Sequence, residues 1–308
     1  MSLIEQAAKR LEQLRQAGVE IPEGIGETPS PVAAPSEVRI GGATTATKEI
    51  PPASMPVEGE PLVQSRKIEL DLEALAASGI ISPNSPRSQI ADEYRVIKRP
   101  LIANAMGKGA APVDNGNLIM VTSALPGEGK SFTAINLAMS IAMELDNTVM
   151  LVDADVARPS VLNMLGLPPA KGLLDVLVEE SVDLSQVLLK TNVEKLTLLP
   201  SGSQHPRATE LLASDAMVRL LQDMANRYSD RIIIFDSPPL LLTTEARVLA
   251  SHMGQVVMVV QAERTLHGEV KQALATIEAC PVRLMVLNKS KGQSTEGYGY
   301  GYGYGYGT

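Results

Sequence analysis

Short apolar runs alternate with helical patterns over the second half of the chain. The apolar runs are rich in β-branched residues and lie at 118–122, 149–152, 196–199, 232–235, 256–260 and 284–287. Patterns with the spacing of an amphipathic helix fall between them, notably at 131–144, 209–227, 243–252 and 268–279. Continuous apolar strands separated by helices are typical of a parallel sheet that is covered on both faces. The pattern therefore predicts a doubly wound α/β domain over residues 114–290.

The first third of the chain lacks this alternation. Apolar residues at helical spacing predict an amphipathic helix over 1–18, which either packs on the body or docks on another chain. Residues 19–66 are rich in Pro, Gly, Ala, Thr and Glu. Such a composition buries little apolar area and predicts a disordered linker. Residues 67–113 predict an extension with a brief strand or helix over 67–80, then a helix over 88–106 that Pro100 must kink or interrupt.

The last segment, 291–308, differs from the rest in composition. Its tyrosines alternate with glycines and are Tyr298, Tyr300, Tyr302, Tyr304 and Tyr306. Glycine at every second position carries an entropic cost in any regular element, so we expect a mobile tail. The tail is either a low-complexity end or a set of phosphate acceptors.

Charge and composition narrow the class of protein. The formal net charge of −8 leaves no basic surplus to neutralise phosphates, which argues against nucleic acid as a partner. The single cysteine, Cys280, cannot form an intramolecular disulfide, and its apolar surroundings predict a buried, inert thiol. The chain contains neither an apolar stretch of membrane-spanning length nor the apolar core of a signal peptide. We therefore expect a cytoplasmic protein that reaches the inner membrane only through a partner.

A glycine-rich loop follows the first apolar run and precedes a helical pattern. Its sequence, SALPGEGKS, fills positions 123–131, with Ala124 at the place of the usual first glycine. This context predicts a P-loop: the backbone N–H groups curl around a phosphate, Lys130 contacts the β- and γ-phosphates, and Ser131 ligates Mg²⁺. ATP and Mg²⁺ are the expected ligands. The loop residues expected to contact the nucleotide are Pro126, Gly127, Glu128, Gly129, Lys130, Ser131 and Phe132.

Two of the later apolar runs end in aspartate. Asp153 and Asp155 follow one run, and Asp236 follows another. In an open parallel sheet the ligand crevice lies beyond the carboxyl ends of the strands, so these carboxylates should converge near Lys130. Mg²⁺ takes hard oxygen ligands, and we expect Asp153, Asp236 and Ser131 to bind it while Asp155 accepts the substrate proton. Alternatively, Asp153 or Asp155 caps the following helix.

Together these motifs resemble the bacterial tyrosine kinases, the autokinases of exopolysaccharide export. The resemblance covers residues 82–308 and rests on SALPGEGKS, DADVARPS, IIIFDSPP and the tyrosine-rich tail. It implies a P-loop NTPase fold of the MinD/ParA-like type. It also implies an ATP-dependent kinase that phosphorylates its own tail tyrosines in trans within an oligomer. The tail is similar to that of the subgroup tied to exosortase-associated polysaccharide loci.

The resemblance assigns roles to individual positions. Lys130, Asp153, Asp155 and Asp236 correspond to the family's catalytic residues. Ala157 stands where the family usually has a basic residue, and Arg158, one position later, is expected to contact phosphate in its place. A pattern used for ring assembly is matched by Asp92, Arg95 and Lys98, for which the alternative is a solvated helix face.

The resemblance also implies partners. These are other copies in a ring, the cytoplasmic end of a membrane-spanning chain-length regulator, and polysaccharide-synthesis enzymes as further substrates. An unphosphorylated tail would insert into a neighbouring active site, and phosphorylation would repel it, because each phosphate adds about −1.5 to −2 charge. Two alternatives belong to other classes: a ParA/MinD-like switch ATPase and a non-catalytic nucleotide-binding scaffold. Switch ATPases carry a signature lysine where this chain has Leu125.

Overall fold

The structure is a computed structural model that describes residues 66–84, 88–179, 181–227 and 231–291. The helix predicted over 1–18, the linker up to residue 65 and the tail from 292 onward lie outside the described residues. The described residues all fall within one compact unit, Gly59–Thr308. None of the helices described is both long enough and apolar enough to cross a membrane.

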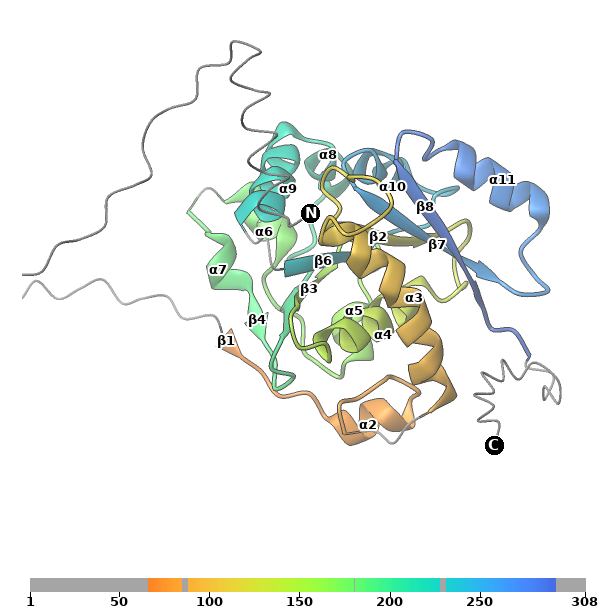
Figure 1. Ribbon diagram of the computed structural model, residues 1–308. Coiled ribbons are helices and arrows are strands. Elements are labelled where there is room, and N and C mark those ends of the chain that lie inside the picture. The colour runs from red at the N-terminus through yellow and green to blue at the C-terminus, as the bar shows by residue number, and fades with distance from the viewer. Residues whose placement is uncertain (1–65, 85–87, 180, 228–230, 292–308) are drawn as a thin grey trace, which may run out of the picture. The chain divides into compact units, whose positions relative to one another are not determined.

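A twisted sheet forms the centre of this unit (Figure 1). Its strand order is β1-β4-β5-β3-β6-β2-β7-β8, and every neighbouring pair is parallel except β4 with β5. The mainly parallel, doubly wound sheet predicted from the apolar runs is therefore confirmed. The strands are β1 (Arg66–Lys67), β2 (Leu118–Ser123), β3 (Thr148–Asp153), β4 (Leu189–Lys190), β5 (Leu196–Leu199), β6 (Arg231–Asp236), β7 (Gln255–Gln261) and β8 (Val282–Asn288).

Helices cover both faces of the sheet and enclose one apolar core on each side (Figure 1). Alternate residues of a strand enter opposite cores, as Met120 and Ile119 of β2 do. Since the central strands are buried on both faces, they read as continuous apolar runs. The helices are α2 (Leu72–Ala77), α3 (Gln89–Ala105), α4 (Lys130–Ala142), α5 (Val161–Met164), α6 (Leu173–Val178), α7 (Leu184–Val187), α8 (Ala208–Leu212), α9 (Asp215–Arg227), α10 (Glu245–Ala250) and α11 (His267–Ala275).

One helix prediction was wrong in detail. The single helix expected over 209–227 is divided into α8 and α9, because the Ser214 hydroxyl accepts a hydrogen bond from the Met217 N–H and so caps a new helix start. Of the two effects predicted for Pro100, a kink or an interruption, the interruption does not occur, because α3 runs continuously from Gln89 to Ala105. The carbonyl that Pro100 leaves without a helical donor belongs to Val96, a residue 74% exposed to solvent that can bond to water instead. The buried thiol predicted for Cys280 is confirmed.

The helix of the predicted extension, α3, is bound tightly to the sheet domain. Lys98 is buried, donates a hydrogen bond to the Ser140 carbonyl (2.6 Å) and pairs with Glu144 (2.6 Å), which follows α4. The Gln255 amide at the start of β7 donates to the Leu101 and Gly116 carbonyls and accepts from Asn104. These contacts join 67–113 and 114–290 into one structural unit.

We expect Gln255→Ala to lower the free energy of unfolding by about 2–4 kcal/mol, because the Leu101 and Gly116 carbonyls and the Asn104 amide each lose their hydrogen bond with Gln255. Urea unfolding measures the change. The matched control is Gln222→Ala on the exposed face of α9, which should change the unfolding free energy by under about 0.5 kcal/mol. An equal effect of the two substitutions would contradict the role of Gln255.

Candidate active site

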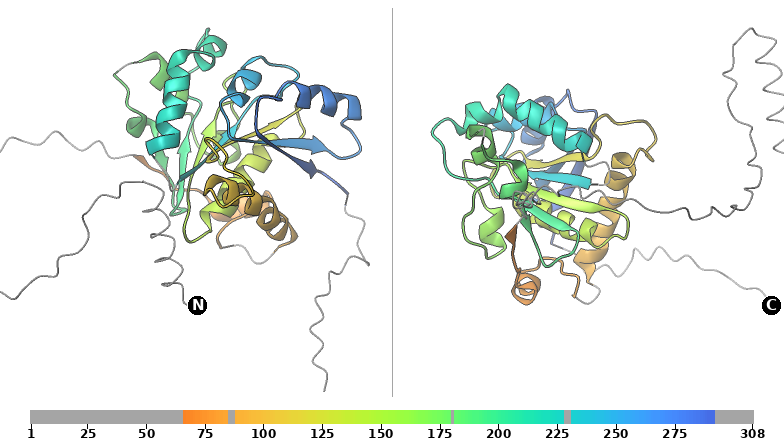
Figure 2. Two further views of the ribbon diagram at one scale, coloured as in Figure 1. Left: turned by 45° about the horizontal axis from the view of Figure 1, so that its top comes forward. Right: turned by 90° about the vertical axis from the view of Figure 1, so that its left-hand side faces the viewer.

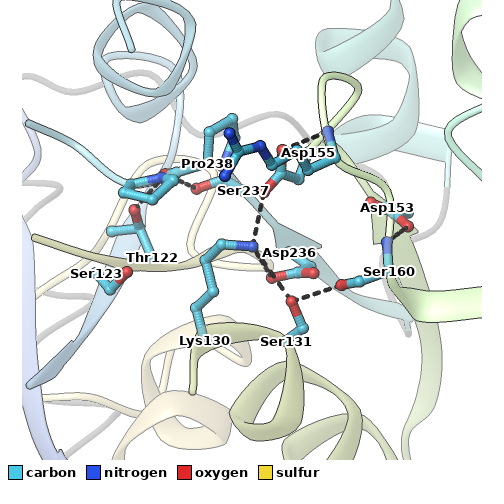
Figure 3. Close-up of polar contacts among 12 residues, drawn as sticks. Thr122, Ser123, Lys130, Ser131, Asp153, Asp155, Ser160, Asp236, Ser237 and Pro238 are labelled. Atoms are coloured by element: carbon cyan, nitrogen blue, oxygen red, sulfur yellow. Dashed lines mark hydrogen bonds and ion pairs between the residues drawn. The ribbon is translucent and has the colours of Figure 1, made fainter. Parts of the chain in front are cut away.

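The carboxyl ends of the central strands bring the predicted acidic residues together (Figure 3). Asp153 ends β3 and Asp236 ends the adjacent strand β6, and the two residues are paired in register. The P-loop follows the next strand, β2, and leads into α4, which begins at Lys130. The predicted convergence of the carboxylates on Lys130 is therefore present in the structure.

The P-loop needs glycine at two positions. Gly127 and Gly129 have φ angles of 81° and 101°, in the left-handed region that favours glycine. A Cβ atom on Gly129 would also lie 2.1 Å from Nδ2 of Asn288. With these backbone conformations the loop ends at the N-terminus of a 13-residue helix, where free N–H groups and the helix dipole favour a bound anion.

Lys130 is the cation at the centre of the site. Its Nζ lies 2.7 Å from Asp155 Oδ2 and 3.6 Å from Asp236 Oδ1, and it donates a hydrogen bond to the Ser131 hydroxyl (Figure 3). Burial alone would lower the pKa of Lys130, but the charges of Asp236 and Asp155 outweigh it and raise this pKa above its usual range. The ammonium therefore stays charged and is held in place for a phosphate.

The Asp236 and Asp153 carboxyl groups are hard to ionise. Burial raises the pKa of Asp236 to about 6 and the pKa of Asp153 to about 7. Lys130 and the Ser131 hydroxyl oppose the shift at Asp236, although neither makes a hydrogen bond of normal geometry with it. Both oxygens of Asp236 and Oδ1 of Asp153 are buried without a hydrogen-bond partner among the described residues. Buried acceptors of this kind normally have a partner, so these atoms are open to one that the protein itself does not supply.

The helix-capping alternative applies to one oxygen of Asp153. Its Oδ2 accepts hydrogen bonds from the N–H groups of Ser160 and Val161, both at 3.0 Å, at the start of α5. The two oxygens of Asp155 also have different contacts. Oδ1 accepts a hydrogen bond from the Arg158 N–H at 3.1 Å, and Oδ2 pairs with Lys130. Each aspartate thus has a structural contact through one oxygen.

A cavity of about 540 Å³ lies beside Lys130 and Asp155. It is lined by Pro126, Gly127, Lys130, Asp155 and Arg158, all predicted, and by residues that the sequence did not single out: Ala157, Ser160, Pro238, Pro239, Leu242 and Thr243. Two other predicted contacts have side chains elsewhere. The Phe132 ring packs beside Gly79 at the extension, and the Glu128 side chain is buried behind the loop. Glu128 and Phe132 could therefore reach a nucleotide only through their backbones.

Glu128 holds the P-loop from behind, a role that the sequence did not predict. Its carboxylate accepts hydrogen bonds from the Leu125 N–H (2.6 Å), the Gln261 N–H (3.4 Å) and the Thr265 hydroxyl. Two residues at the end of β8 hold the same loop: the Asn288 amide donates to the Glu128 carbonyl and the Lys289 ammonium to the Gly127 carbonyl. The loop conformation therefore depends on residues more than 130 positions later in the chain.

We expect Glu128→Ala to weaken Mg-nucleotide binding about tenfold or more, because the loop loses three partly buried hydrogen bonds and with them its shape. Calorimetric titration with a non-hydrolysable ATP analogue measures the change. Glu278→Ala, which removes an exposed carboxylate beyond α11, is the control and should bind like the wild type. Equal affinity of the two variants would show that the loop holds its shape without Glu128.

The oxygen atoms of the site suit Mg²⁺ in the presence of a nucleotide. Among the described residues, no group of three or more His, Cys, Asp or Glu side chains is arranged to hold a metal ion by itself. A magnesium ion bound with a nucleotide needs only one or two protein carboxylates beside phosphates and waters. The buried oxygens of Asp236 and Asp153 that lack a hydrogen-bond partner can supply such ligands, and the Ser131 hydroxyl lies close to Asp236. The residues present therefore fit the ion.

The same carboxylates should cost stability when no ligand is bound. We expect Asp236→Asn to raise the melting temperature at pH 8 by about 2–6 °C, because it removes a buried charge near two other carboxylates. The pKa of Asp236 is raised from 3.8 to about 6, so the folded state binds the proton more tightly and loses stability as pH rises through this window. The gain should therefore shrink at pH 5, where the wild-type carboxyl is mostly protonated.

Calorimetry without nucleotide or metal makes this comparison, with the exposed Asp146→Asn as control. A melting temperature that falls at pH 8 in the Asp236 variant would contradict the electrostatic account.

The fold and the site together define a P-loop nucleotide-binding protein. A family described as "AAA domain" matches residues 116–288. The tyrosine-protein kinase YwqD of Bacillus subtilis is 31% identical over 214 residues, which cover 69% of this chain and 86% of that relative. The putative tyrosine-protein kinase CapB of Staphylococcus aureus is 28% identical, over 70% of this chain and 91% of that relative. The chain belongs to the bacterial tyrosine kinase family, as its motifs predicted.

A solved structure and a further relative agree with this family. The crystal structure of the chimerical protein CapA2B2 has a TM-score of 0.57 and 29% identity, and the match covers 74% of this chain and 94% of that one. The putative tyrosine-protein kinase EpsB of Ralstonia nicotianae is 33% identical over 172 residues. In that case the match covers 56% of this chain but only 22% of the relative.

Proposed function

We propose that this protein is an ATP-dependent tyrosine kinase that phosphorylates the tyrosines of its own tail. The observation that carries the proposal is the position of Lys130, which lies in the cavity beside Asp155 and Asp236 at the N-terminus of α4. A triphosphate bound on the P-loop would attract this ammonium away from the carboxylates. Asp155 would then be free of its ion pair.

The proposed reaction needs positioning and charge more than covalent chemistry. The tyrosine oxygen attacks the γ-phosphorus, the bond from that phosphorus to the β,γ-bridging oxygen breaks, and ADP leaves. Asp155 accepts the phenolic proton, while Lys130 and the P-loop N–H groups neutralise charge on the phosphates. Asp236, Asp153 and Ser131 would hold Mg²⁺, which supplies charge neutralisation between the phosphates. Arg158, whose side chain lines the cavity, is placed to contact the phosphates.

We propose that transfer occurs between copies of the chain in a ring. Asp92 and Arg95 are exposed and form an ion pair on α3, where a neighbour can reach them. Lys98 is buried and pairs with Glu144 of its own chain, so it would hold α3 in place without contacting the neighbour directly. The proposed acceptors are Tyr298, Tyr300, Tyr302, Tyr304 and Tyr306. The regulation of exopolysaccharide synthesis, and activation by the cytoplasmic end of a membrane-spanning regulator, are proposed from the family.

Incubation with labelled ATP and Mg²⁺, followed by phosphotyrosine detection and phosphosite mapping, tests the activity. We expect label on the tail of the wild type, alone or with an activator, and a loss of at least about 100-fold in Lys130→Met, because the transferred phosphoryl loses its charge partner. Replacing all five tail tyrosines by Phe should remove most label and leave nucleotide binding unchanged.

Lys171→Met, at an exposed lysine outside the cavity, is the matched control and should keep full activity. Release of phosphate from ATP without tyrosine label would point to a switch ATPase, and binding without turnover to a scaffold. Sedimentation of the all-Phe variant tests the ring, and a monomer in both ATP and ADP would contradict it.

A further inference from the structure

The strand β8 ends the sheet on one side (Figure 2). It pairs with β7, and no described strand lies on its other edge. An open edge presents unpaired backbone N–H and C=O groups and readily accepts a further strand. Proteins usually protect such an edge, so a cover for β8 is expected.

One face of β8 is also exposed. Met285 and Leu287 are 60% and 64% exposed, and Arg283 lies on the same face. Their register partners on β7 enter the apolar core on that side of the sheet. On the opposite face, Leu284 and Val286 pack against the other core. The apolar layer that covers β7 therefore stops before β8.

We propose that the tail of the same chain docks on β8 as an antiparallel strand. The glycine–tyrosine alternation has a period of two, which in a strand places all five tyrosines on one face and the glycines on the other. Nine residues, 289–297, separate the end of β8 from Tyr298, enough for a hairpin connection. The stretch 298–306 matches the seven residues of β8 with little excess.

The exposed face of β8 suits tyrosine. Arg283 offers a cation to an aromatic ring, Met285 offers a polarisable sulfur, and Leu287 offers an apolar surface. The backbone hydrogen bonds of an added strand would contribute affinity and the alternate side chains would set the register, as in other cases of strand addition. Glycines on the opposite face would leave the packing of Leu284 and Val286 unobstructed.

Docking would regulate the proposed kinase reaction, and this regulatory part of the inference rests on the proposed function. A tyrosine held on β8 is withdrawn from any active site, so only the undocked fraction of tails can be phosphorylated. Neighbouring tyrosines on one face of a strand lie about 6.7 Å apart, and phosphates at that spacing repel one another. Phosphorylation therefore favours the released tail.

Disulfide scanning tests the docking without any need for kinase activity. In a full-length chain with Cys280→Ala and Lys130→Met, Met285→Cys is combined with a cysteine at each position from 298 to 306 in turn. Mild oxidation by copper phenanthroline joins the two thiols where they meet. We expect the most efficient cross-link at the tyrosine position opposite Met285, weaker ones at the other tyrosine positions, and at least fivefold weaker ones at the glycine positions next to the strongest, because only residues on one face approach Met285. The cross-linked product should be monomeric.

Each alternative outcome overturns part of the proposal. Equal cross-linking along the tail, or none, would exclude a docked strand. Alternation in a disulfide-linked dimer would assign the edge to a second copy of the chain. Leu145→Cys in place of Met285→Cys is the control: this residue is 87% exposed in the turn after α4, and it should show no alternation.

An activity measurement tests the withdrawal of the tyrosines separately. If about nine tenths of the tails are docked, Met285→Ser with Leu287→Ser should raise the initial rate of tail phosphorylation up to about tenfold, with KM for ATP unchanged. An unchanged rate in an active kinase would show that docking does not limit the reaction. An inactive wild type would refute the proposed function, while the cross-linking result would still decide the docking.

Discussion

A single ammonium group, that of Lys130, faces three buried carboxylates at the carboxyl edge of the sheet. It makes ion pairs with two of them, Asp155 and Asp236, while Asp153 lies close enough for its charge to raise the Lys130 pKa. Burial, assisted by the neighbouring carboxylates, raises the pKa of Asp153 to about 7 and that of Asp236 to about 6. Such an arrangement lowers the stability of the folded protein when no ligand is bound. It suits a site that binds a cation and a polyphosphate together.

Much of this site could be predicted from the sequence, because the end of each apolar run marks the position of a residue at the carboxyl edge of the parallel sheet. Asp153 and Asp236 each come directly after an apolar run, and in a parallel sheet the ends of such runs meet at one edge. The P-loop could be predicted for the same reason: its glycines and Lys130 stand between a strand and a helix. The fold class followed from the same alternation of apolar runs and helical patterns.

Other features depend on contacts between distant residues and leave no local pattern. Glu128 is predicted as a loop residue near phosphate, yet its side chain bonds to Thr265, 137 positions later. Lys98 resembles a surface residue in its sequence context, but α3 packs on α4 and buries it against Glu144. The two-residue strands β1 and β4 are too short to produce a periodicity.

The two oxygens of the Asp153 carboxylate have different contacts, and this difference affects the interpretation of variants at this position. One oxygen fixes the first turn of α5, and the other is free for a ligand. Asp153→Ala would therefore remove a possible metal ligand and the hydrogen bonds that hold the start of α5 at the same time. The second loss would also affect Ser160, whose hydroxyl bonds to Ser131. An asparagine retains one carbonyl oxygen for the helix while abolishing the negative charge. Only a comparison of Asp153→Ala with Asp153→Asn separates the loss of the helix contact from the loss of the negative charge.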